Sequence, residues 1–463
     1  MPHQFNPTIL REYDIRGIVG QSLFAADAHA IGRAFAATLT AGRGAPSEKR
    51  VAVGYDGRLT SPELEAALVD GLAEGGVDVV RIGLGPTPML YFAAATLPVD
   101  GGIMVTGSHN PPEHNGFKLV LDGKAFFGEA IQKLGQTAAL LGPATAPRGR
   151  VESKSVFDAY IARLAQDYDG ARALSVVWDC GNGATGEVVA QLTQRLPGRH
   201  VLLNERIDGT FPAHHPDPTV PENLVQLQQA VAAERCDLGI GFDGDGDRIG
   251  VVDARGRILW GDQLLIILAR DVLSRRPGAS IIADVKASQV LFDEIARAGG
   301  EPVMMETGHS LIKTRLAATG APLAGEMSGH IFFADHWYGF DDAIYVAVRL
   351  LGILGRAHET LSEMRDKLPE VVNTPEIRID VEEARKFAIV EEVRARLRQR
   401  GADMVEIDGV RVHTGDGWWL LRASNTQAVI VVRAEANSPN ELERVKNELA
   451  AEIAPSGIAL PGD

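Results

Sequence analysis

The sequence predicts an α/β protein in which three related α/β domains and a smaller α+β module surround one cleft. Short apolar segments alternate with helical patterns along most of the chain, which is typical of α/β layers. One theme then occurs three times: an apolar run ending in aspartate, a helical pattern, a second apolar run, and a third run that ends in a polar, glycine-rich loop. The C-terminal part follows a different order of elements.

Length and composition narrow the class of protein. The chain has 463 residues, more than a single core usually covers, so about three or four domains are expected. Hydrophobic residues make up 45% and charged residues 23%, as in ordinary globular proteins. The formal net charge of −15 argues against nucleic acid or an anionic membrane as the main partner. A local basic cleft could still hold a small acidic molecule.

The N-terminal segment and the cysteines indicate the compartment. The first residues lack the basic start and apolar core of a signal peptide, and no apolar stretch is long enough to span a membrane. Cys180 and Cys236 are too few for a disulfide framework and lie beside apparent strands, as small buried residues do. We therefore expect a cytoplasmic protein.

The three related domains are predicted from matching segments. Their opening strands are 51–56, 176–179 and 281–284, each ending in aspartate. Their second apolar runs are 77–82, 200–203 and 302–305, and their third runs end at loops 106–110, 243–248 and 325–330. Because ligands of α/β sheets bind at the carboxyl ends of strands, equivalent connections would present all three loops to one cleft.

The C-terminal module is predicted to be α+β. We expect a strand at 374–379, a charged helix at 381–400, short strands around 404, 411, 418 and 429, and a last amphipathic helix at 439–453. The expected domains are 1–150, 151–255, 256–369 and 370–463. Because a short linker at 367–372 joins the module, we expect it to rock and close over a ligand.

The first loop, VTGSHNPP at 105–112, follows a buried-strand pattern and places a hydroxyl at a strand end. A glycine permits the turn and two prolines restrict the backbone behind it. Ser108, beside His109, is interpreted as a nucleophile. The alternative is a polar turn without a catalytic role.

The second loop places Asp243, Asp245 and Asp247 at alternate positions. Three carboxylates can meet one hard cation, and magnesium suits a site where phosphate or water takes the remaining positions. An EF-hand calcium loop is excluded, since it requires glycine at the position of Arg248 and glutamate at that of Ala254. A structural acidic turn is the alternative, although three adjacent carboxylates repel one another.

The third loop and the last module carry groups that suit a sugar phosphate. Glu326, Ser328 and His330 combine acceptors and an imidazole between glycines, as neighbouring sugar hydroxyls require; a helix-capping turn is the alternative. In the last module, an arginine fork, two hydroxyls and an amide at 422–426, followed by Arg433, suit a dianionic phosphate. A solvated hairpin turn is the alternative.

Other polar residues follow predicted strand ends. Each alone is typical of a surface cation or a satisfied polar group, but together they favour a basic cleft within an acidic protein. They are Tyr13, Arg16, Arg58, Lys118, Lys286 and His309.

With these loops in view, the chain resembles the α-D-phosphohexomutase superfamily, specifically its bacterial phosphomannomutase/phosphoglucomutase branch. The resemblance covers essentially the whole chain and rests on four motifs in order: TGSHNPP, DGDGDR, GEMSGH and RASNT. It implies a heart-shaped arrangement of three related α/β domains with mixed sheets and a C-terminal TATA-box-protein-like α+β domain.

The residues and the resemblance together give an expected role to each candidate. The expected catalytic residues are Ser108, which would carry the phosphoryl group, with His109, Lys118, Arg248 and His330. The expected magnesium ligands are Asp243, Asp245, Asp247 and an oxygen of phosphorylated Ser108. The expected substrate contacts are Tyr13, Arg16, Lys286, His309, Glu326, Ser328, Arg422, Ser424, Asn425, Thr426 and Arg433.

The implied activity is a mutase that interconverts the 1-phosphates and 6-phosphates of mannose and glucose. Phosphorylated serine would make a hexose 1,6-bisphosphate, which reorients in the cleft and returns the other phosphoryl group. A grip on O3 and O4 is insensitive to the configuration at C2, so both sugars would be accepted. Glucose 1,6-bisphosphate would restore the phosphoserine after hydrolysis. We expect a monomer, with a dimer as the alternative.

Other functions are weighed against this one. Met327 favours this branch over phosphoglucosamine mutases, which tend to carry glutamine there, whereas Gln427 and Ala428 depart from relatives that have a proline nearby. A magnesium-dependent sugar phosphatase would use the same loops but release phosphate. A non-catalytic binding protein is disfavoured, because binding alone needs neither the serine nor three metal-type carboxylates.

Overall fold

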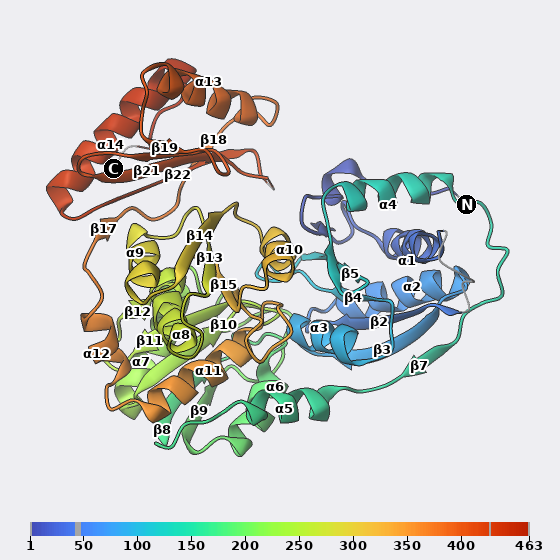
Figure 1. The fold of residues 1–463 in the computed structure, drawn as a ribbon. Coiled ribbons are helices and arrows are strands. Elements are labelled where there is room, and N and C mark those ends of the chain that lie inside the picture. Colours follow the sequence, from blue (N-terminus) through green and yellow to red (C-terminus); the bar gives the residue numbers. More distant parts are fainter. Residues whose placement is uncertain (1, 42–47, 426, 462–463) are drawn as a thin grey trace.

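Figure 1 presents the computed structural model, which describes residues 2–41, 48–425 and 427–461. The first domain lies on one side (blue), the second and third pack together (green to orange), and the last module (red) sits above the third. The predicted α/β class, with a separate C-terminal module, is confirmed.

The first domain is built on one sheet with helices on both faces. Its strands are β1 (Ile15–Ile18), β2 (Arg50–Tyr55), β3 (Asp78–Leu84), β4 (Gly101–Val105), β5 (His114–Leu121), β6 (Lys124–Phe126) and β7 (Val151–Ser153). Its helices are α1 (Ala25–Thr40), α2 (Ser61–Glu74), α3 (Thr87–Thr96) and α4 (Glu129–Leu140).

The second and third domains follow the same plan. The second contains α5 (Phe157–Gln166), β8 (Leu174–Asp179), α6 (Gly186–Leu192), β9 (Gly198–Leu203), α7 (Val225–Glu234), β10 (Leu238–Phe242), β11 (Ile249–Asp253) and β12 (Ile258–Leu259). The third contains α8 (Gly261–Arg275), β13 (Ser280–Asp284), α9 (Gln289–Arg297), β14 (Glu301–Met305), α10 (His309–Thr319), β15 (Leu323–Gly325), β16 (Ile331–Phe333), α11 (Ala343–Arg356) and α12 (Leu361–Asp366).

The three sheets share one strand order, which accounts for the repeated sequence theme. The shared unit runs β5-β4-β2-β3 in the first sheet, β11-β10-β8-β9 in the second and β16-β15-β13-β14 in the third. Three strands of each unit are parallel and the remaining one, β5, β11 or β16, is antiparallel. The polar loops leave β4, β10 and β15 at their carboxyl ends, so equivalent topology brings them to equivalent places.

Two sheets extend past the positions where the sequence places domain edges. Strand β7 pairs with β3, so the first sheet includes 151–153, beyond residue 150. Strand β12 pairs with β11, so the second sheet includes 258–259, beyond residue 255. These short edge strands have no alternating pattern long enough to read from sequence.

The last module is an antiparallel sheet covered on its outer face by two helices (Figure 1). It contains β17 (Val372–Asn373), β18 (Ile377–Asp380), α13 (Lys386–Gln399), β19 (Met404–Val405), β20 (Val410–His413), β21 (Gly417–Ala423), β22 (Val429–Ala436) and α14 (Pro439–Ile453).

The module differs from the sequence prediction in two elements. The strand expected at 374–379 begins only at Ile377 as β18, and β17 ends before it at Asn373. Pro375 lies in the break between them, because proline has no N–H for a ladder. The helix expected from 381 begins at Lys386, since the Val381 N–H instead donates to Ala428 O at 3.0 Å, extending the β18 edge. Helix α14 has its predicted limits; the Ser438 hydroxyl caps it by accepting from the Glu441 N–H.

The hydrophobic core joins three domains and leaves the fourth separate. The largest hydrophobic cluster is continuous across the first three domains. It includes Leu90 in the first domain, Trp178 in the second and Tyr345 in the third. The last module has its own core and meets the third domain through a small cluster formed by Val285, Trp418 and Leu420. Among the described residues, no helix has the length and apolar character that crossing a membrane requires.

Candidate active site

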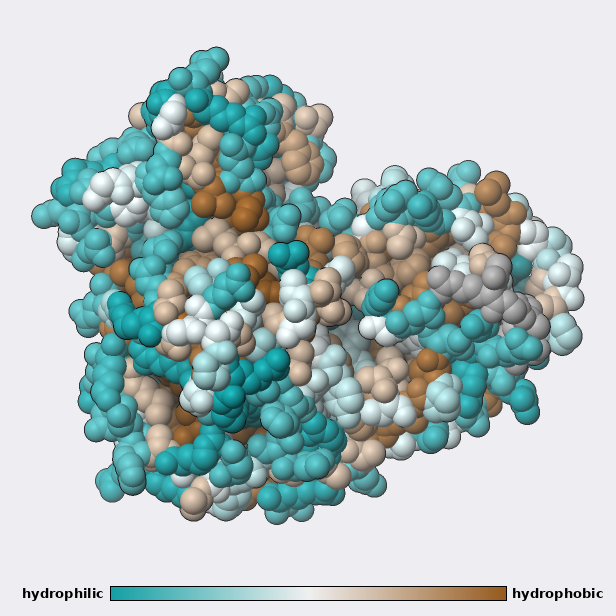
Figure 2. Space-filling view, viewed as in Figure 1, coloured by the Kyte–Doolittle hydropathy of each residue, from teal (hydrophilic) through white to brown (hydrophobic). Residues whose placement is uncertain are grey.

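A cavity of about 1030 Å³ lies where the four domains meet. Figure 2 shows the molecule hollowed between the last module and the first domain, with hydrophilic side chains over much of this face. Every domain contributes predicted site residues to the lining: Arg16 and His109 from the first, Arg248 from the second, Lys286, His309, Glu326, Ser328 and His330 from the third, and Arg422, Ser424, Asn425 and Arg433 from the last.

Ser108 lies on the turn after β4, directly before His109 and Asn110, which line this cleft. Its side chain is buried, and its φ of 50° places a non-glycine residue in the left-handed region. Such backbone conformations cost about 1–3 kcal/mol and persist where the surroundings enforce them, commonly at functional sites. The Ser108 hydroxyl donates to Asp243 Oδ2 at 3.0 Å and lies 3.2 Å from His109 Nδ1. Burial, then Arg248 and Arg16, lower the pKa of His109 well below its ordinary value, so the imidazole is neutral.

Asp56 and Arg58 hold this loop in place. Asp56 accepts from the Thr106 hydroxyl at 2.8 Å and from the Gly107 N–H at 3.2 Å. The fully buried Arg58 guanidinium donates to four carbonyls at 2.5–3.0 Å, those of Ser108, Asn110, Pro111 and His114. The expectation that Arg58 belongs to the basic cleft is therefore wrong, because its two terminal nitrogens donate to the loop backbone and its Nε lies 3.3 Å from Asp56. A Cβ on Gly107 would lie 2.5 Å from this guanidinium, which explains the glycine.

The acidic loop after β10 meets the serine loop directly. A Cβ on Gly244 would lie 2.4 Å from Ser108 O, so a glycine lets the two backbones touch. Asp243 Oδ1 accepts three backbone N–H groups at 2.9–3.1 Å, which curls the loop. Ligand atoms of Asp243, Asp245 and Asp247 all lie within 4.8 Å of one another, and all three residues are buried.

The charge balance of this cluster fits a bound cation. Burial, then Asp245 and Asp247, raise the pKa of Asp243 well above its ordinary value. Burial would lower the pKa of Lys118, but the same two carboxylates outweigh it and raise the pKa. The Lys118 ammonium contacts Asp247 and lies 2.7 Å from Asp245. Nevertheless Asp245 Oδ1 and Asp247 Oδ1 remain buried without a hydrogen-bond partner in the described structure. Orphaned carboxylate oxygens of this kind are what a metal ion satisfies.

Glu326 and Ser328 lie on the turn after β15. The Ser328 hydroxyl donates to Glu326 Oε2 at 3.0 Å, and the Gly308 N–H donates to Oε1 at 2.7 Å, which fixes the carboxylate at the cleft. Asp284, at the end of β13, accepts from the Met327 N–H at 3.2 Å. Burial raises the pKa of Asp284 to about 6. Equivalent strand-end aspartates, Asp56 and Asp284, thus anchor the loops of two domains.

His330 stands between two charged partners. The Arg248 Nε–H donates to His330 Nε2 at 2.9 Å, and His330 Nδ1 lies 3.0 Å from Asp341 Oδ2. His309 stacks on its ring with 5.4 Å between centroids. Burial, followed by Lys313, lowers the pKa of His309 well below its ordinary value. Asp341 thereby orients an imidazole that faces the cleft. Its only sign in the sequence is that it stands beside a second aspartate, Asp342.

The last module closes the cleft with Arg422 and its neighbours. The Arg422 Nε–H donates to Asp408 at 2.8 Å, and among the described residues no hydrogen bond occupies its other guanidinium nitrogens, which line the cleft. The Asn425 amide donates to the Tyr13 hydroxyl at 2.8 Å, and that hydroxyl donates to Thr307 O at 2.9 Å. Tyr13 thus joins three domains, and burial raises its pKa to about 12. Thr426 lies outside the described residues.

Lys286 and Arg433, which were predicted as substrate contacts, also help to join the third domain to the last module. Lys286 Nζ donates to Glu376 at 3.2 Å, and Arg433 donates to Lys286 O and contacts Met327 Sδ. Arg16, in the first domain, donates to Asn110 at 2.9 Å and pairs with Asp14. The four predicted loops therefore converge, with their cations on the cleft wall.

Comparison with protein families identifies the whole arrangement. Successive models of phosphoglucomutase/phosphomannomutase match along the chain: alpha/beta/alpha domain I at 7–139, domain II at 158–256, domain III at 260–372 and the C-terminal domain at 376–452. The chain belongs to this family.

Relatives in the same family match over nearly their full length. A Pseudomonas putida phosphomannomutase/phosphoglucomutase is 46% identical over 453 residues, covering 98% of this chain and 97% of the relative. A Neisseria gonorrhoeae phosphoglucomutase is 43% identical over 448 residues, covering 96% of each chain. A crystal structure of a family protein from Burkholderia thailandensis superposes with a TM-score of 0.93 at 44% identity, covering 99% of this chain and all of that one.

Proposed function

We propose that this chain is a phosphomannomutase/phosphoglucomutase that interconverts hexose 1-phosphate and hexose 6-phosphate. The family and its 46% identical relatives support mutase activity. The single observation that supports the chemistry most is the 3.0 Å contact between the Ser108 hydroxyl and Asp243, beside His109 and Arg248, which line the cleft with Arg422.

In the proposed first step, phosphorylated Ser108 transfers its phosphoryl group to O6 of a hexose 1-phosphate. The bond from phosphorus to Oγ breaks, the bond from phosphorus to O6 forms, and the O6 proton passes to a neutral acceptor. His109 suits this role, because burial keeps its imidazole unprotonated and it lies beside Ser108. His330, fixed between Arg248 and Asp341, is the second candidate.

In the second step the hexose 1,6-bisphosphate turns end for end, so that the phosphate on O6 occupies the site formed by Arg422, Ser424 and Asn425. The bond from phosphorus to O1 breaks, a bond from phosphorus to Ser108 Oγ forms, and O1 takes back the proton held by the imidazole. Hexose 6-phosphate and phosphorylated Ser108 result. Glu326 and Ser328 would hold O3 and O4 in both orientations, which makes the configuration at C2 immaterial. Arg16, Lys286, His309 and Arg433 would offset phosphate charge on the cleft wall.

Magnesium is the cation we propose for Asp243, Asp245 and Asp247, with an oxygen of phosphorylated Ser108. When bound, it would offset negative charge on the phosphoryl group in transit. Arg248 and Lys118 add positive charge from the protein itself. Glucose 1,6-bisphosphate is the proposed activator, since it carries a phosphoryl group that could rephosphorylate Ser108.

We further propose that the protein acts in the cytoplasm as a monomer. Both cysteines are free and buried, which suits a reducing compartment. All four proposed loops come from one chain, so a second copy is not needed to complete the cleft. The molar mass measured by light scattering distinguishes a monomer from a dimer, since one chain has a mass of 49.6 kDa.

The decisive test combines intact mass with a coupled assay. Wild type treated with glucose 1,6-bisphosphate should carry one phosphate that Ser108→Ala lacks, while Ser155→Ala, at an exposed position, keeps it. Wild type should convert glucose 1-phosphate and mannose 1-phosphate without releasing phosphate. A phosphate adduct on Ser108→Ala would defeat the assignment. Net phosphate release would identify a phosphatase, and faster turnover of glucosamine 6-phosphate would identify a phosphoglucosamine mutase.

A further inference from the structure

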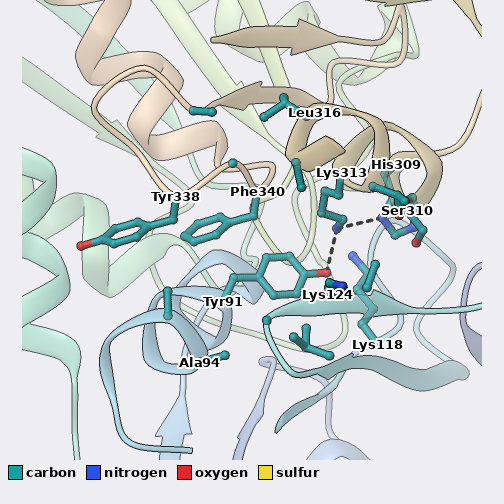
Figure 3. A pocket seen from close by; sticks show the side chains of 18 of the residues that line it. Tyr91, Ala94, Lys118, Lys124, His309, Ser310, Lys313, Leu316, Tyr338 and Phe340 are labelled. Carbon is teal, nitrogen blue, oxygen red and sulfur yellow. Dashed lines mark hydrogen bonds between the residues drawn. The ribbon is translucent and has the colours of Figure 1, made fainter. Parts of the chain in front are cut away.

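A second cavity, of about 520 Å³, lies between the first and third domains and borders the catalytic cleft (Figure 3). One wall is formed by helix α3 and the turn before β6, and the other by helix α10 and the segment 334–340. Its volume lies within the range of about 300–1,000 Å³ that is usual for sites of small organic ligands. Tyr13 and His309 line this cavity as well as the catalytic cleft, and Lys118 also lines it, but its other lining residues have no role in the proposed function.

The cavity has an aromatic side. Tyr91 and Phe340 lie with ring centroids 5.4 Å apart, and Tyr338 stacks on Phe340 with an interplanar angle of 4°. Figure 3 shows these three rings along one side, with Ala94 and Leu316 near them. Such a surface favours a flat apolar group, which can stack on the rings without needing hydrogen bonds.

The opposite end is cationic. Lys124 is exposed and makes no side-chain hydrogen bond or ion pair with any residue in the described part of the chain. Lys313 lies 4.4 Å from the centre of the Tyr91 ring and 2.9 Å from Asp341, so its charge is already balanced. Lys124 therefore supplies the uncompensated charge, and an anion is the complementary ligand.

We propose that this cavity is a regulatory site for an aromatic organic anion. The ring of the ligand lies against Tyr91, Tyr338 and Phe340, and its acidic group lies at Lys124. Small alanine side chains on α3 and α10 leave the space that the ring occupies.

The two helices that line the cavity begin in the catalytic cleft. Thr87, the first residue of α3, donates its hydroxyl to Asp245 at 2.6 Å and its N–H to Asp245 O at 2.8 Å. Helix α10 begins at His309, directly after Gly308, whose N–H donates to Glu326. A ligand between the helices therefore acts on the acidic loop and on the sugar loop through two rigid elements.

Coupling between two binding sites is reciprocal. A hexose phosphate in the cleft must change the affinity of the aromatic anion by the same factor as the anion changes the affinity of the hexose phosphate. This second part of the inference rests on the proposed function, whereas binding of the anion does not.

The test uses 8-anilinonaphthalene-1-sulfonate, an aromatic sulfonate whose fluorescence rises on binding. It is titrated into wild type and into the variants Lys124→Glu and Ala95→Trp. Ala95 lies at an exposed position on α3, so a tryptophan there places a large ring in the cavity. The matched controls are Lys154→Glu and Ala232→Trp, at exposed positions away from the cavity. Melting temperatures establish that each variant is folded.

We expect saturable binding to wild type, a dissociation constant raised about tenfold in Lys124→Glu because attraction becomes repulsion, and loss of binding in Ala95→Trp. The controls should match wild type, and saturating glucose 1-phosphate should change the wild-type dissociation constant at least about twofold, as ordinary allosteric coupling does. Equal binding by all the variants, or no binding to wild type, would overturn the proposed site. An unchanged dissociation constant with glucose 1-phosphate would overturn the coupling. The mutase rate without the probe tests the proposed function separately.

Discussion

Replacing Lys118 with methionine tests whether its ammonium and a divalent cation share the acidic loop. Lys118 lies 2.7 Å from Asp245 and also contacts Asp247, and all three side chains are buried. Removing one partner of a buried ion pair costs about 3–5 kcal/mol, because the other charge is left unpaired. At about 2–4 °C per kcal/mol for a domain of this size, Lys118→Met in EDTA should melt about 10 °C below wild type.

Magnesium should reverse much of this loss, because the ammonium no longer competes for the three carboxylates. A ligand at a hundred times its Kd stabilises a fold by about 2.7 kcal/mol. Thermal unfolding in EDTA and in saturating MgCl2 therefore should show a larger magnesium shift for Lys118→Met than for wild type. Lys154→Met, which changes an exposed lysine, should behave as wild type in both. Equal shifts in wild type and Lys118→Met would refute the idea that the two cations share one site.

Three further predictions follow from the same contacts. Gly244→Ala places a Cβ 2.4 Å from Ser108 O, so the mutase rate should fall at least about tenfold and the free energy of unfolding should fall by about 1–3 kcal/mol. Gly142→Ala, whose added carbon has no atom within 4 Å, should leave the rate and the stability unchanged. A normal rate in Gly244→Ala would contradict the loop contact. Arg411 is buried and donates to Val285 O and Ala287 O at 2.8 Å, so it joins the last module to the third domain. Arg411→Ala should therefore raise KM more than it lowers kcat and should enlarge the radius of gyration in small-angle scattering, whereas Arg444→Ala should change neither. Unchanged scattering of Arg411→Ala would count against this contact between the domains. Burial raises the pKa of Asp342 to about 7, so the folded chain keeps a proton that the unfolded chain releases near pH 4. The stabilisation from this protonated carboxyl is complete below pH 4, and about 4 kcal/mol of the free energy of unfolding is lost as the pH rises to 7. Urea midpoints of Asp342→Asn should fall less over that range, and parallel curves for the two proteins would refute the assignment.

Local sequence was sufficient for much of the fold. The alternation of apolar runs and helical patterns gave the three related domains, because each sheet buries its strands on both faces and each helix buries one stripe. Helix α14 could be predicted to its ends, since Ser438 and Pro439 mark its start and Leu442, Val445 and Leu449 recur on one face. Short edge strands such as β7 could not be predicted, because a three-residue segment has too little pattern of its own and becomes a strand only by pairing with its neighbour, β3.

The sequence alone determined which side chains we propose for the chemistry. Ser108, the alternating aspartates and the two sugar-phosphate loops stand in local patterns at strand ends, where short-range turn and strand preferences decide the conformation. Only the tertiary structure decided how they are held and charged. Arg58 holds the serine loop, 50 residues further along the chain, and Tyr13 joins three domains. Asp341 and Asp408 orient His330 and Arg422. Burial and ion pairing depend on which distant segments pack together, and no local pattern contains that information.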